Sequence, residues 1–264
     1  MKRNKTFRRL NKMSNFFGLD AYRLFLNMKG LPKYYRDYRI IKKQKQNSSS
    51  FKFGSAFPVL HDWADEAGVA SGHYYHQDLF VAQKICKANP HRHIDIGSRV
   101  DGFVAHVAAF RPIEIIDFRD LKSKSQNISF TQADLMNLPD HLIDSCDSIS
   151  SLHAIEHFGL GRYGDPIDYL GHEKALSNIQ RIVKKGGCFY FSVPIGEQRI
   201  EFNAHRVFSV RYLLEILQKD FTVKSFSFVD DAGDFYPEQQ LDDQSINKNY
   251  GCHYGCGIFE LIRK

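Results

Sequence analysis

The sequence of 264 residues lacks any apolar run of about 18 residues or more, the length that a bilayer-spanning helix needs. It also has only five cysteines, spread along the chain. An odd number at such spacing does not indicate a disulfide framework. Few disulfides favour a reducing compartment. The basic start is not followed by an apolar core and small residues, so a secretory signal is not expected. We therefore expect a cytoplasmic protein, with contact to the inner face of the membrane left open.

Acidic residues are scarce in the first 50 positions, where Asp20 and Asp37 stand against 14 lysines and arginines, a net charge of +12. Because the whole chain carries +6, residues 51–264 carry −6. Basic segments attract nucleic acid, anionic lipid head groups and anionic substrates. Apolar residues at helical spacing from Phe16, with a restart after Pro32, predict two short basic amphipathic helices.

These helices have two possible locations. They either pack on the main domain with a charged face toward solvent, or they lie on a membrane surface. Aromatic and basic residues are mixed rather than segregated, which favours packing on the main domain. The polar stretch "QKQNSSSFKFG" indicates a linker. We therefore predict a basic helical extension and linker over residues 1–50 and a main domain over 51–264.

The main domain shows short apolar runs that alternate with longer amphipathic segments. Runs such as "HIDIG", "IEIID", "DSISSL" and "GCFYFSVP" indicate strands, and a helix is expected from about Tyr74 to Lys87. This alternation predicts an α/β fold, with a mostly parallel sheet and helices on both faces. Sheets of this kind bind ligands at the carboxyl ends of their strands.

The stretch "HRHIDIGSRVDGFVAHV", residues 91–107, predicts a strand that turns into a helix. Gly97 ends the strand, and Asp101 is expected to cap the helix. Asp117 closes the next strand, 20 residues beyond Gly97, where nucleotide-binding sheets place an acid on the ribose hydroxyls. Asp95 lies within the first strand, where a carboxylate would repel a diphosphate. It suits a cationic ligand such as S-adenosylmethionine, which carries a sulfonium and an α-ammonium group.

In order and spacing, residues 91–195 resemble class I S-adenosylmethionine-dependent methyltransferases. "HIDIGSRVDGF" is similar to their first motif, and "IEIID" to the second strand with its ribose acid. "ISFTQADLMNLP" resembles the segment that meets the adenine, "DSCDSISSLHAIEHFG" the fourth strand, and "ALSNIQRIVKKGGCFYFSVP" the helix and fifth strand. The resemblance implies a Rossmann-like, mostly parallel seven-stranded sheet in a methyltransferase-like catalytic domain, with S-adenosylmethionine as cofactor.

The resemblance also implies a set of cofactor-binding residues. Arg99 replaces the second glycine of the family's first motif, and the third is displaced by one residue to Gly102. The Arg99 side chain either folds away or meets the carboxylate of the cofactor. Asp134 would meet the adenine amino group. His153 either packs near the cofactor or is a structural histidine. The implied cofactor site comprises Asp95, Gly97, Ser98, Arg99, Gly102, Asp117, Asp134, Leu135, His153 and Gln77.

More narrowly, "GHYYHQDLFVA" and "FNAHRVFSV" resemble a methyltransferase-like family encoded among bacterial surface-polysaccharide genes. That resemblance implies a carbohydrate or sugar-nucleotide acceptor, O-methylated during polysaccharide biosynthesis. Methyl transfer needs an in-line approach and a base for the proton of the nucleophile. A histidine suits this because its ordinary pKa lies near neutrality. The candidate catalytic residues are His157, Glu156 and His205, and the candidate acceptor-binding residues are Arg199, Arg206 and Tyr74.

Three alternatives stay open. "HAIEH" has the H-x-x-E-H pattern of zinc peptidases, through His153, Glu156 and His157. A strand-like run before it and two glycines after it argue against the required helix, and "CHYGC" lacks a second ligand pair, so we predict no metal site. A non-catalytic module with a methyltransferase-like fold is the second alternative. Nucleic-acid methylation is the third, although the main domain is acidic and lacks a base-handling motif.

Overall fold

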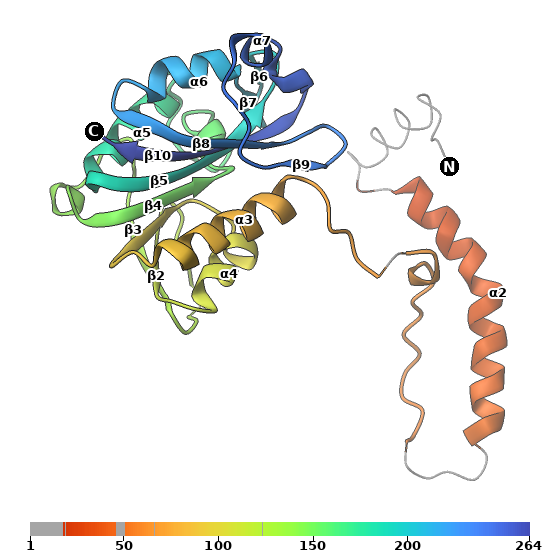
Figure 1. The fold of residues 1–264 in the computed structure, drawn as a ribbon. Helices are drawn as coiled ribbons and strands as arrows, with labels where there is room; N and C mark the ends of the chain where they lie inside the picture. The colour runs from red at the N-terminus through yellow and green to blue at the C-terminus, as the bar shows by residue number, and fades with distance from the viewer. Residues whose placement is uncertain (1–17, 19, 46–50, 66, 123) are drawn as a thin grey trace. The chain divides into compact units, whose positions relative to one another are not determined.

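The computed structural model describes residues 18, 20–45, 51–65, 67–122 and 124–264 (Figure 1). The chain divides into two units, Met1–Val69 and Ala70–Lys264, and each is described by itself. Within the described part of the chain, every helix is too short or too polar to cross a membrane.

The first unit contains the helix α2 (Ala21–Gln44) and the short helix η2 (Asp62–Ala64). Asp20 caps α2 by accepting hydrogen bonds from the amides of Tyr22 and Arg23, both at 3.0 Å. The prediction of two short helices is wrong, because α2 continues through Pro32. An internal proline costs roughly 3 kcal/mol, and the uninterrupted hydrogen bonds on either side offset that cost. Phe16, the first apolar residue of the predicted pattern, lies outside the described residues.

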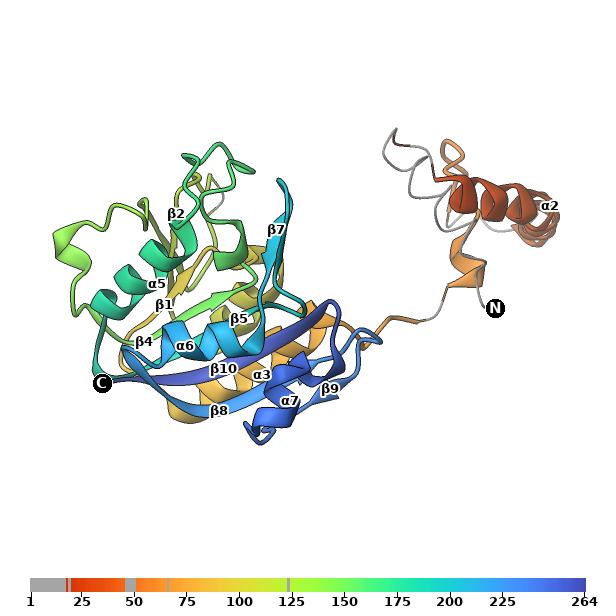
Figure 2. The ribbon, with the colours of Figure 1, turned by 90° about the horizontal axis from the view of Figure 1, so that it is seen from above.

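The second unit is built on an eight-stranded sheet in the order β3-β2-β1-β4-β5-β10-β8-β9 (Figures 1 and 2). Strands β3, β2, β1, β4 and β5 run parallel, and β10 is antiparallel to both of its neighbours. The predicted α/β fold is confirmed, with the two-residue β9 as an additional edge strand. The strands are β1 (His93–Ile96), β2 (Ile113–Asp117), β3 (Ile128–Gln132), β4 (Cys146–Leu152), β5 (Val183–Ile195), β8 (Phe221–Val229), β9 (Phe235–Tyr236) and β10 (Gly255–Arg263).

Helices cover both faces of the sheet, as predicted (Figure 2). On one face, α3 (His73–Ala88) and the segment formed by η3 (Val100–Val104) and α4 (Ala105–Ala108) pack on a core that includes Ile113 and Ile115. On the other, α5 (Gly171–Ile182) and α6 (Val210–Leu217) pack on a core that includes Ile94 and Ile116. Alternate residues of β2 thus enter opposite cores, as the pleat of a strand requires. The predicted Tyr74–Lys87 helix is α3, one residue longer at each end.

The remaining elements lie in the connections between strands and helices. They are η4 (Asp140–Leu142), η5 (Ile155–His157), β6 (Arg199–Glu201), β7 (His205–Val207), α7 (Asp243–Asn247) and η6 (Asn249–Gly251). Strands β6 and β7 form a separate antiparallel hairpin after β5. Since β1 pairs in parallel with both β2 and β4, the carboxyl ends of these three strands adjoin one another. The residues that follow them therefore meet at one edge of the sheet.

Candidate functional site

A cavity of about 860 Å³ opens at the carboxyl ends of β1, β2 and β4. Its volume lies within the range of roughly 300–1,000 Å³ that is typical of small-molecule sites. It is a location where parallel sheets commonly bind ligands. Of the residues predicted from the sequence, those that line it are Tyr74, Gly97, Ser98, Arg99, Asp117, Asp134, Leu135, His153, Glu156, His157 and His205.

The turn after β1 is closed by Gly97, whose φ is +65°. A Cβ on this residue would lie 3.2 Å from the Cβ of Ala154 and 3.8 Å from Oδ2 of Asp117. The Gly97 amide donates a hydrogen bond to the carbonyl of Ile116 at 3.1 Å. Both the left-handed backbone and the narrow space favour glycine here. The turn therefore presents bare backbone toward the cavity.

Asp95 lies under this turn, fully buried, and does not line the cavity. Its carboxylate accepts hydrogen bonds from the amide of Ser98 at 3.0 Å, from Oγ of Ser98 at 2.7 Å and from Oγ of Ser150 at 2.6 Å. Burial raises the pKa of Asp95 to about 6, although these hydrogen bonds act in the opposite direction. Through its hydrogen bonds to Ser98, the Asp95 side chain fixes the turn that follows β1.

The start of the following helix differs from the prediction. Asp101 is not the helix cap: the cap position is held by Arg99, and Asp101 lies within η3. The two side chains form a bidentate ion pair, with Arg99 Nε and Nη2 at 3.0 and 2.8 Å from the Asp101 carboxylate. Because the carboxylate is paired in this way, it is drawn to Arg99 rather than to the helix amides. The Arg99 guanidinium also lies 5.2 Å from the centre of the Tyr74 ring, at the cavity wall.

Gly102 faces α3 rather than the cavity. A Cβ on this residue would lie 2.5 Å from Oδ2 of Asp78, which is itself buried. Burial raises the pKa of Asp78 to about 6, against a hydrogen bond from Gln77. The sequence analysis predicted that Gly102 would lie against the cofactor. In the structure, its missing side chain instead lets η3 lie close to α3.

At the end of β2, Asp117 lines the cavity and is paired with Arg119. Nε and Nη2 of Arg119 lie 3.0 and 2.7 Å from the two carboxylate oxygens, and the Arg119 amide donates to Oδ1 at 2.8 Å. The Arg119 guanidinium also lies over the ring of Tyr163, 4.3 Å from its centre. Arg119 thus uses three of the roughly four acceptor positions of the carboxylate that a ligand hydroxyl would also need.

Asp134 and Leu135 follow β3 and line the cavity next to Asp117. Oδ1 of Asp134 accepts a hydrogen bond from the amide of Met136 at 2.9 Å. The side chain of Leu135 is buried, and the Leu135 carbonyl accepts from Nδ2 of Asn178 at 2.7 Å. A charged oxygen and an apolar surface are thus adjacent, the combination that a purine ring with an exocyclic amino group requires.

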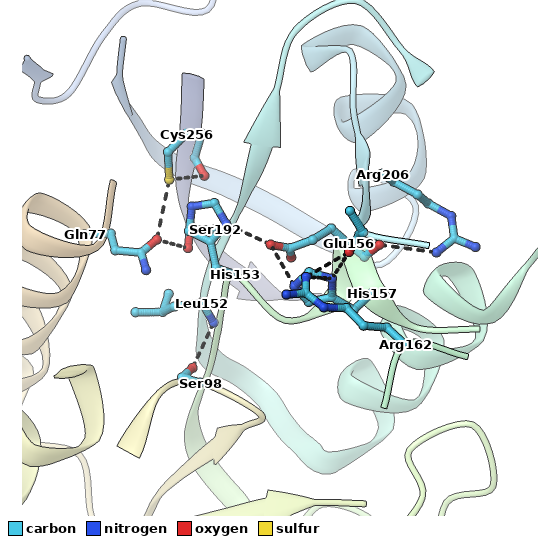
Figure 3. A network of polar contacts seen from close by, with 12 residues as sticks. Gln77, Ser98, Leu152, His153, Glu156, His157, Arg162, Ser192, Arg206 and Cys256 are labelled. Carbon is cyan, nitrogen blue, oxygen red and sulfur yellow. Dashed lines mark hydrogen bonds and ion pairs between the residues drawn. The ribbon is translucent and has the colours of Figure 1, made fainter. Parts of the chain in front are cut away.

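His153 and Glu156 form a buried pair beyond β4 (Figure 3). Nδ1 of His153 lies 2.8 Å from Oε1 of Glu156. Burial disfavours the charged forms of both side chains, but their mutual attraction outweighs burial. The pKa of Glu156 is lowered by His153, and the pKa of His153 is raised by Cys256 and Glu156. We therefore treat Glu156 as ionised and Nδ1 of His153 as protonated.

His157 faces the cavity from the adjoining 3₁₀ turn, η5. Nδ1 of His157 donates a hydrogen bond to the carbonyl of Ala204 at 2.7 Å, which assigns the lone pair of the neutral ring to Nε2. Burial lowers the pKa of His157, although Glu156 acts against this change. His205, on β7, also lines the cavity, with Nε2 at 3.3 Å from a carboxylate oxygen of Glu201.

Besides Asp95 and Gly102, three more predicted site residues lie outside the cavity lining. Arg206 is buried and donates hydrogen bonds to the carbonyls of Phe158 at 2.6 Å and Tyr169 at 3.0 Å (Figure 3). Arg199 is held by Glu201 at 2.9 Å and by the carbonyl of His253 at 3.1 Å. Gln77 is buried and accepts a hydrogen bond from Oγ of Ser192 at 2.6 Å. All three side chains tie elements of the protein together, because their polar atoms are used internally.

The model of the family described as "Caenorhabditis protein of unknown function, DUF268" matches residues 110–249, more than half of the chain. The chain belongs to the DUF268 family. No curated protein matches its sequence.

Two solved structures similar to this DUF268 member are methyltransferases. The 1,6-didemethyltoxoflavin-N1-methyltransferase of Burkholderia thailandensis, solved with bound S-adenosylhomocysteine, is 15% identical with a TM-score of 0.51, and the match covers 76% of this chain and 80% of that one. The N-methyltransferase NodS of Bradyrhizobium japonicum WM9 is 12% identical with a TM-score of 0.50, over 74% and 99% of the two chains. The second unit therefore has the fold of these methyltransferases.

The H-x-x-E-H pattern of this DUF268 chain does not lie on a helix. His153 follows β4 with a φ of +52°, and His157 ends the 3₁₀ turn η5. Gly159 and Gly161, both with positive φ, follow it. The expectation that a strand before the pattern and glycines after it would prevent a helix is confirmed. The two histidines are thus not arranged as in zinc peptidases.

Sequence reasoning missed several residues of the cavity wall. Arg119 stands two positions after Asp117, and an arginine so close to a strand-ending acid is a signal that could have been used. Arg162 lies in a loop and donates to the carbonyl of Ala204 at 3.0 Å. Tyr254 precedes β10, which lies beside β5, and no local pattern indicates that it reaches the cavity.

Proposed function

We propose that this protein is an S-adenosylmethionine-dependent methyltransferase that O-methylates a sugar or glycan in surface-polysaccharide biosynthesis. One observation carries the cofactor assignment: the Gly97 turn and the Asp117 carboxylate meet at the wall of the cavity. Bare backbone beside an acid at this edge of a parallel sheet is the usual arrangement for binding a nucleoside.

The residues present fit that cofactor. Asp117 would accept hydrogen bonds from the ribose hydroxyls, Asp134 would accept one from the adenine amino group, and Leu135 would pack on the ring. Gly97 lines the cavity with backbone that carries no Cβ. When bound, S-adenosylmethionine supplies a methyl group activated by its positive sulfonium.

His157 is proposed as the general base. Its Nδ1 is committed to the Ala204 carbonyl, so Nε2 is the atom that would accept the proton of an acceptor hydroxyl. The lowered pKa of His157 keeps the ring neutral near pH 7, which is the form a base needs. Glu156, with Oε1 at 3.8 Å from Nε2 of His157, would stabilise the resulting imidazolium. His205 lies on the same wall, where we propose it contacts the acceptor.

The carbohydrate assignment is supported by the aromatic residues of the cavity and by the sequence resemblance to a surface-polysaccharide branch. Tyr74, Tyr163 and Tyr254 line the cavity, and their rings offer an apolar face together with a hydroxyl group. A sugar presents the complementary surface, with C–H groups on its faces and hydroxyls at its edge. Arg162 also lines the cavity, and its guanidinium would suit the phosphate of a nucleotide-linked sugar.

The test is calorimetric titration of the full-length, cofactor-free protein with S-adenosylmethionine and S-adenosylhomocysteine. We expect both ligands to bind at one site per chain. Asp117→Ala is expected to weaken binding roughly tenfold or more, since hydrogen bonds to a charged group contribute about 1.5–3 kcal/mol. The matched variant Asp140→Ala removes an exposed carboxylate of η4 and should bind like the parent protein.

A non-catalytic module is the second candidate, and the Asp117–Arg119 pair is the observation that favours it. If Arg119 permanently replaces the ribose, neither ligand will bind to folded protein, and the methyltransferase proposal fails. If Arg119 only guards the carboxylate, Arg119→Ala will tighten the binding of both ligands. The direction of that change therefore distinguishes the two functions.

We also infer that the first unit contacts anionic membrane surfaces. The described part of α2 exposes Leu24, Phe25 and Met28, and Lys29 lies on the same helix. Although these residues are not on separate faces, the exposed apolar side chains could enter a lipid interface and the basic ones attract anionic head groups. Such contact would bring the protein to a lipid-linked acceptor.

A further inference from the structure

Three side chains that bind transition metals in many proteins converge beside the cavity. They are His73 at the start of α3, His153 after β4 and Cys256 on β10. One ligand atom from each lies within 4.8 Å of the other two. His153 and Cys256 are buried, and His73 is half-buried. Segments far apart in the sequence thus bring together two imidazoles and a thiol, so no local sequence motif indicates this cluster.

The orientation of His153 suggests what the cluster binds. Its Nδ1 is occupied by Oε1 of Glu156 at 2.8 Å, while its Nε2 is buried and makes no hydrogen bond of normal geometry among the described residues, with Cys256 as its electrostatic neighbour. Figure 3 shows His153 between Cys256 on one side and Glu156 on the other. A metal-binding histidine characteristically gives its second nitrogen to a carboxylate, which fixes the ring and raises its basicity. A buried ring nitrogen that faces a thiol, while the other nitrogen is held by a carboxylate, is the arrangement expected of a metal-binding histidine.

We propose that His73, His153 and Cys256 bind a divalent transition-metal ion of the zinc class. Two nitrogens and one sulfur form a ligand set that suits zinc and disfavours magnesium or calcium, which prefer oxygen. Three protein ligands leave a fourth position for water or another exchangeable ligand. The carboxylate of Glu156 acts as the outer partner of His153 and balances part of the charge of the ion.

Binding requires a small movement, which the local structure permits. Zinc–ligand bonds of about 2.0–2.3 Å place tetrahedral ligands about 3.3–3.6 Å apart, so the cluster must close by roughly 1 Å. The rings of His73 and His153 are nearly parallel, with centres 5.2 Å apart, and His73 would have to turn. His73 is the first residue of α3 and follows Gly72, whose φ is +89°. A helix end beside a glycine accommodates such a change more readily than a strand does.

The surroundings of Cys256 also tolerate the loss of its proton. Sγ of Cys256 donates to Oε1 of Gln77 at 3.5 Å, a weak interaction, and the same oxygen accepts from Oγ of Ser192 at 2.6 Å (Figure 3). Metal binding would release the thiol proton. Gln77 would keep its stronger hydrogen bond, so no buried acceptor would lose its partner.

This site departs from the expectation of a protein without metal. Of the two cysteines of "CHYGC", Cys256 joins the cluster with histidines from elsewhere in the fold. It also differs from the H-x-x-E-H hypothesis, since Glu156 and His157 are not ligands. The proposal is independent of methyl transfer, because its test reads metal binding itself.

The experiment uses full-length protein stripped of metal with a chelator and then titrated with Co²⁺. A thiolate–cobalt charge-transfer band and visible d–d bands should appear and saturate at one equivalent. Zn²⁺ should abolish both, and elemental analysis should find one zinc per chain. Cys256→Ser should remove the charge-transfer band, and His73→Ala should weaken Co²⁺ binding at least about tenfold. The matched controls Cys86→Ser, at an exposed thiol, and His76→Ala, one turn further along α3, should behave like the parent protein.

Circular dichroism melts verify that each variant is folded. If Cys256→Ser is unfolded, the test rests on His73→Ala, at a half-buried position, and on the charge-transfer band of the parent protein. Folded parent protein that takes up neither ion would overturn the proposal. A charge-transfer band that persists in folded Cys256→Ser would do so as well. Rapid alkylation of Cys256 without metal uptake would point instead to a thiolate–imidazolium pair and would equally refute the metal site.

Discussion

Among single residues, Asp95 makes the clearest pH-dependent contribution. Burial raises its pKa to about 6 in the native state, from an ordinary value of 3.8. Between these two values the unfolded chain has lost the proton while the native protein keeps it. Stability contributed by this group is therefore greatest below about pH 4 and falls as the pH rises toward about 7, by up to about 3 kcal/mol.

Replacing the carboxylate tests this assignment. Asp95→Asn cannot ionise, so the loss of stability between about pH 4 and about pH 7 should shrink, whatever constant penalty the amide brings. The measurement is urea unfolding of both proteins across that range. Asp140→Asn serves as the control, because Asp140 is exposed. Parallel stability profiles for Asp95→Asn and the parent protein would show that Asp95 is ionised in the native state throughout.

Single residues also show which parts of the site the sequence could predict. Gly97 and Asp117 were found because each ends a strand, and the paired strands β1 and β2 then bring them together. Arg206 has the same chemistry as a substrate-binding arginine, but its guanidinium serves backbone carbonyls. Nothing in the residues beside it distinguishes the two uses. Only the fold decides which polar side chain faces the cavity.

At the scale of elements, the contact between η3 and α3 depends on Gly102. A Cβ added there would meet Oδ2 of Asp78 at 2.5 Å, inside a buried interface. We expect Gly102→Ala to destabilise the protein by about 1–3 kcal/mol, the usual cost of overpacking. Thermal or urea unfolding would measure this loss.

A double-mutant cycle identifies the cause. Asp78→Ala removes the atom that the new Cβ would meet, so the double variant should lose less stability than the sum of the two single variants. Residues in contact show coupling energies of about 0.5–3 kcal/mol. Strict additivity would mean that Gly102 matters through its backbone angles, which are φ −121° and ψ −105°, and not through this contact.

Elements differed in how well the sequence predicted them. Strands such as β1 and helices such as α3 followed from local periodicity and turn residues, and both were confirmed. Pro32 was interpreted as a break, yet α2 continues because the bonds of a long helix outweigh one missing donor. The Arg99–Asp101 pair replaced the expected cap, since a nearby guanidinium attracts a carboxylate more strongly than a helix amide does. Competition between two local interactions is what sequence patterns resolve least well.

For the whole molecule, the uneven distribution of charge predicts how the protein meets a surface. Residues 1–50 carry +12, and the remaining residues carry −6. Coulomb forces would therefore draw the first segment toward an anionic membrane and repel the rest from it. The net charge of +6 alone conceals this division.

Co-sedimentation with vesicles of phosphatidylcholine and phosphatidylserine tests the proposed contact. The full-length protein should bind, and binding should weaken as salt is raised from about 0.05 M to about 0.5 M, because ions screen exposed charges. Lys42→Gln with Lys43→Gln should reduce the affinity by about 2 kcal/mol, roughly 30-fold, at about 1 kcal/mol per lysine near the surface. Lys184→Gln with Lys185→Gln removes the same charge from an exposed pair in the second unit and should change binding little.

The two double variants distinguish net charge from its location. Equal losses in both would mean that the membrane responds to the total charge of +6 and that α2 has no special role. A loss confined to the α2 variant would mean that the first unit makes the contact, because the two proteins carry the same net charge. Binding that persists at high salt in both would show that the exposed apolar side chains of α2, such as Leu24 and Phe25, dominate. Binding to vesicles of phosphatidylcholine alone would then be equally strong, which contradicts the electrostatic proposal.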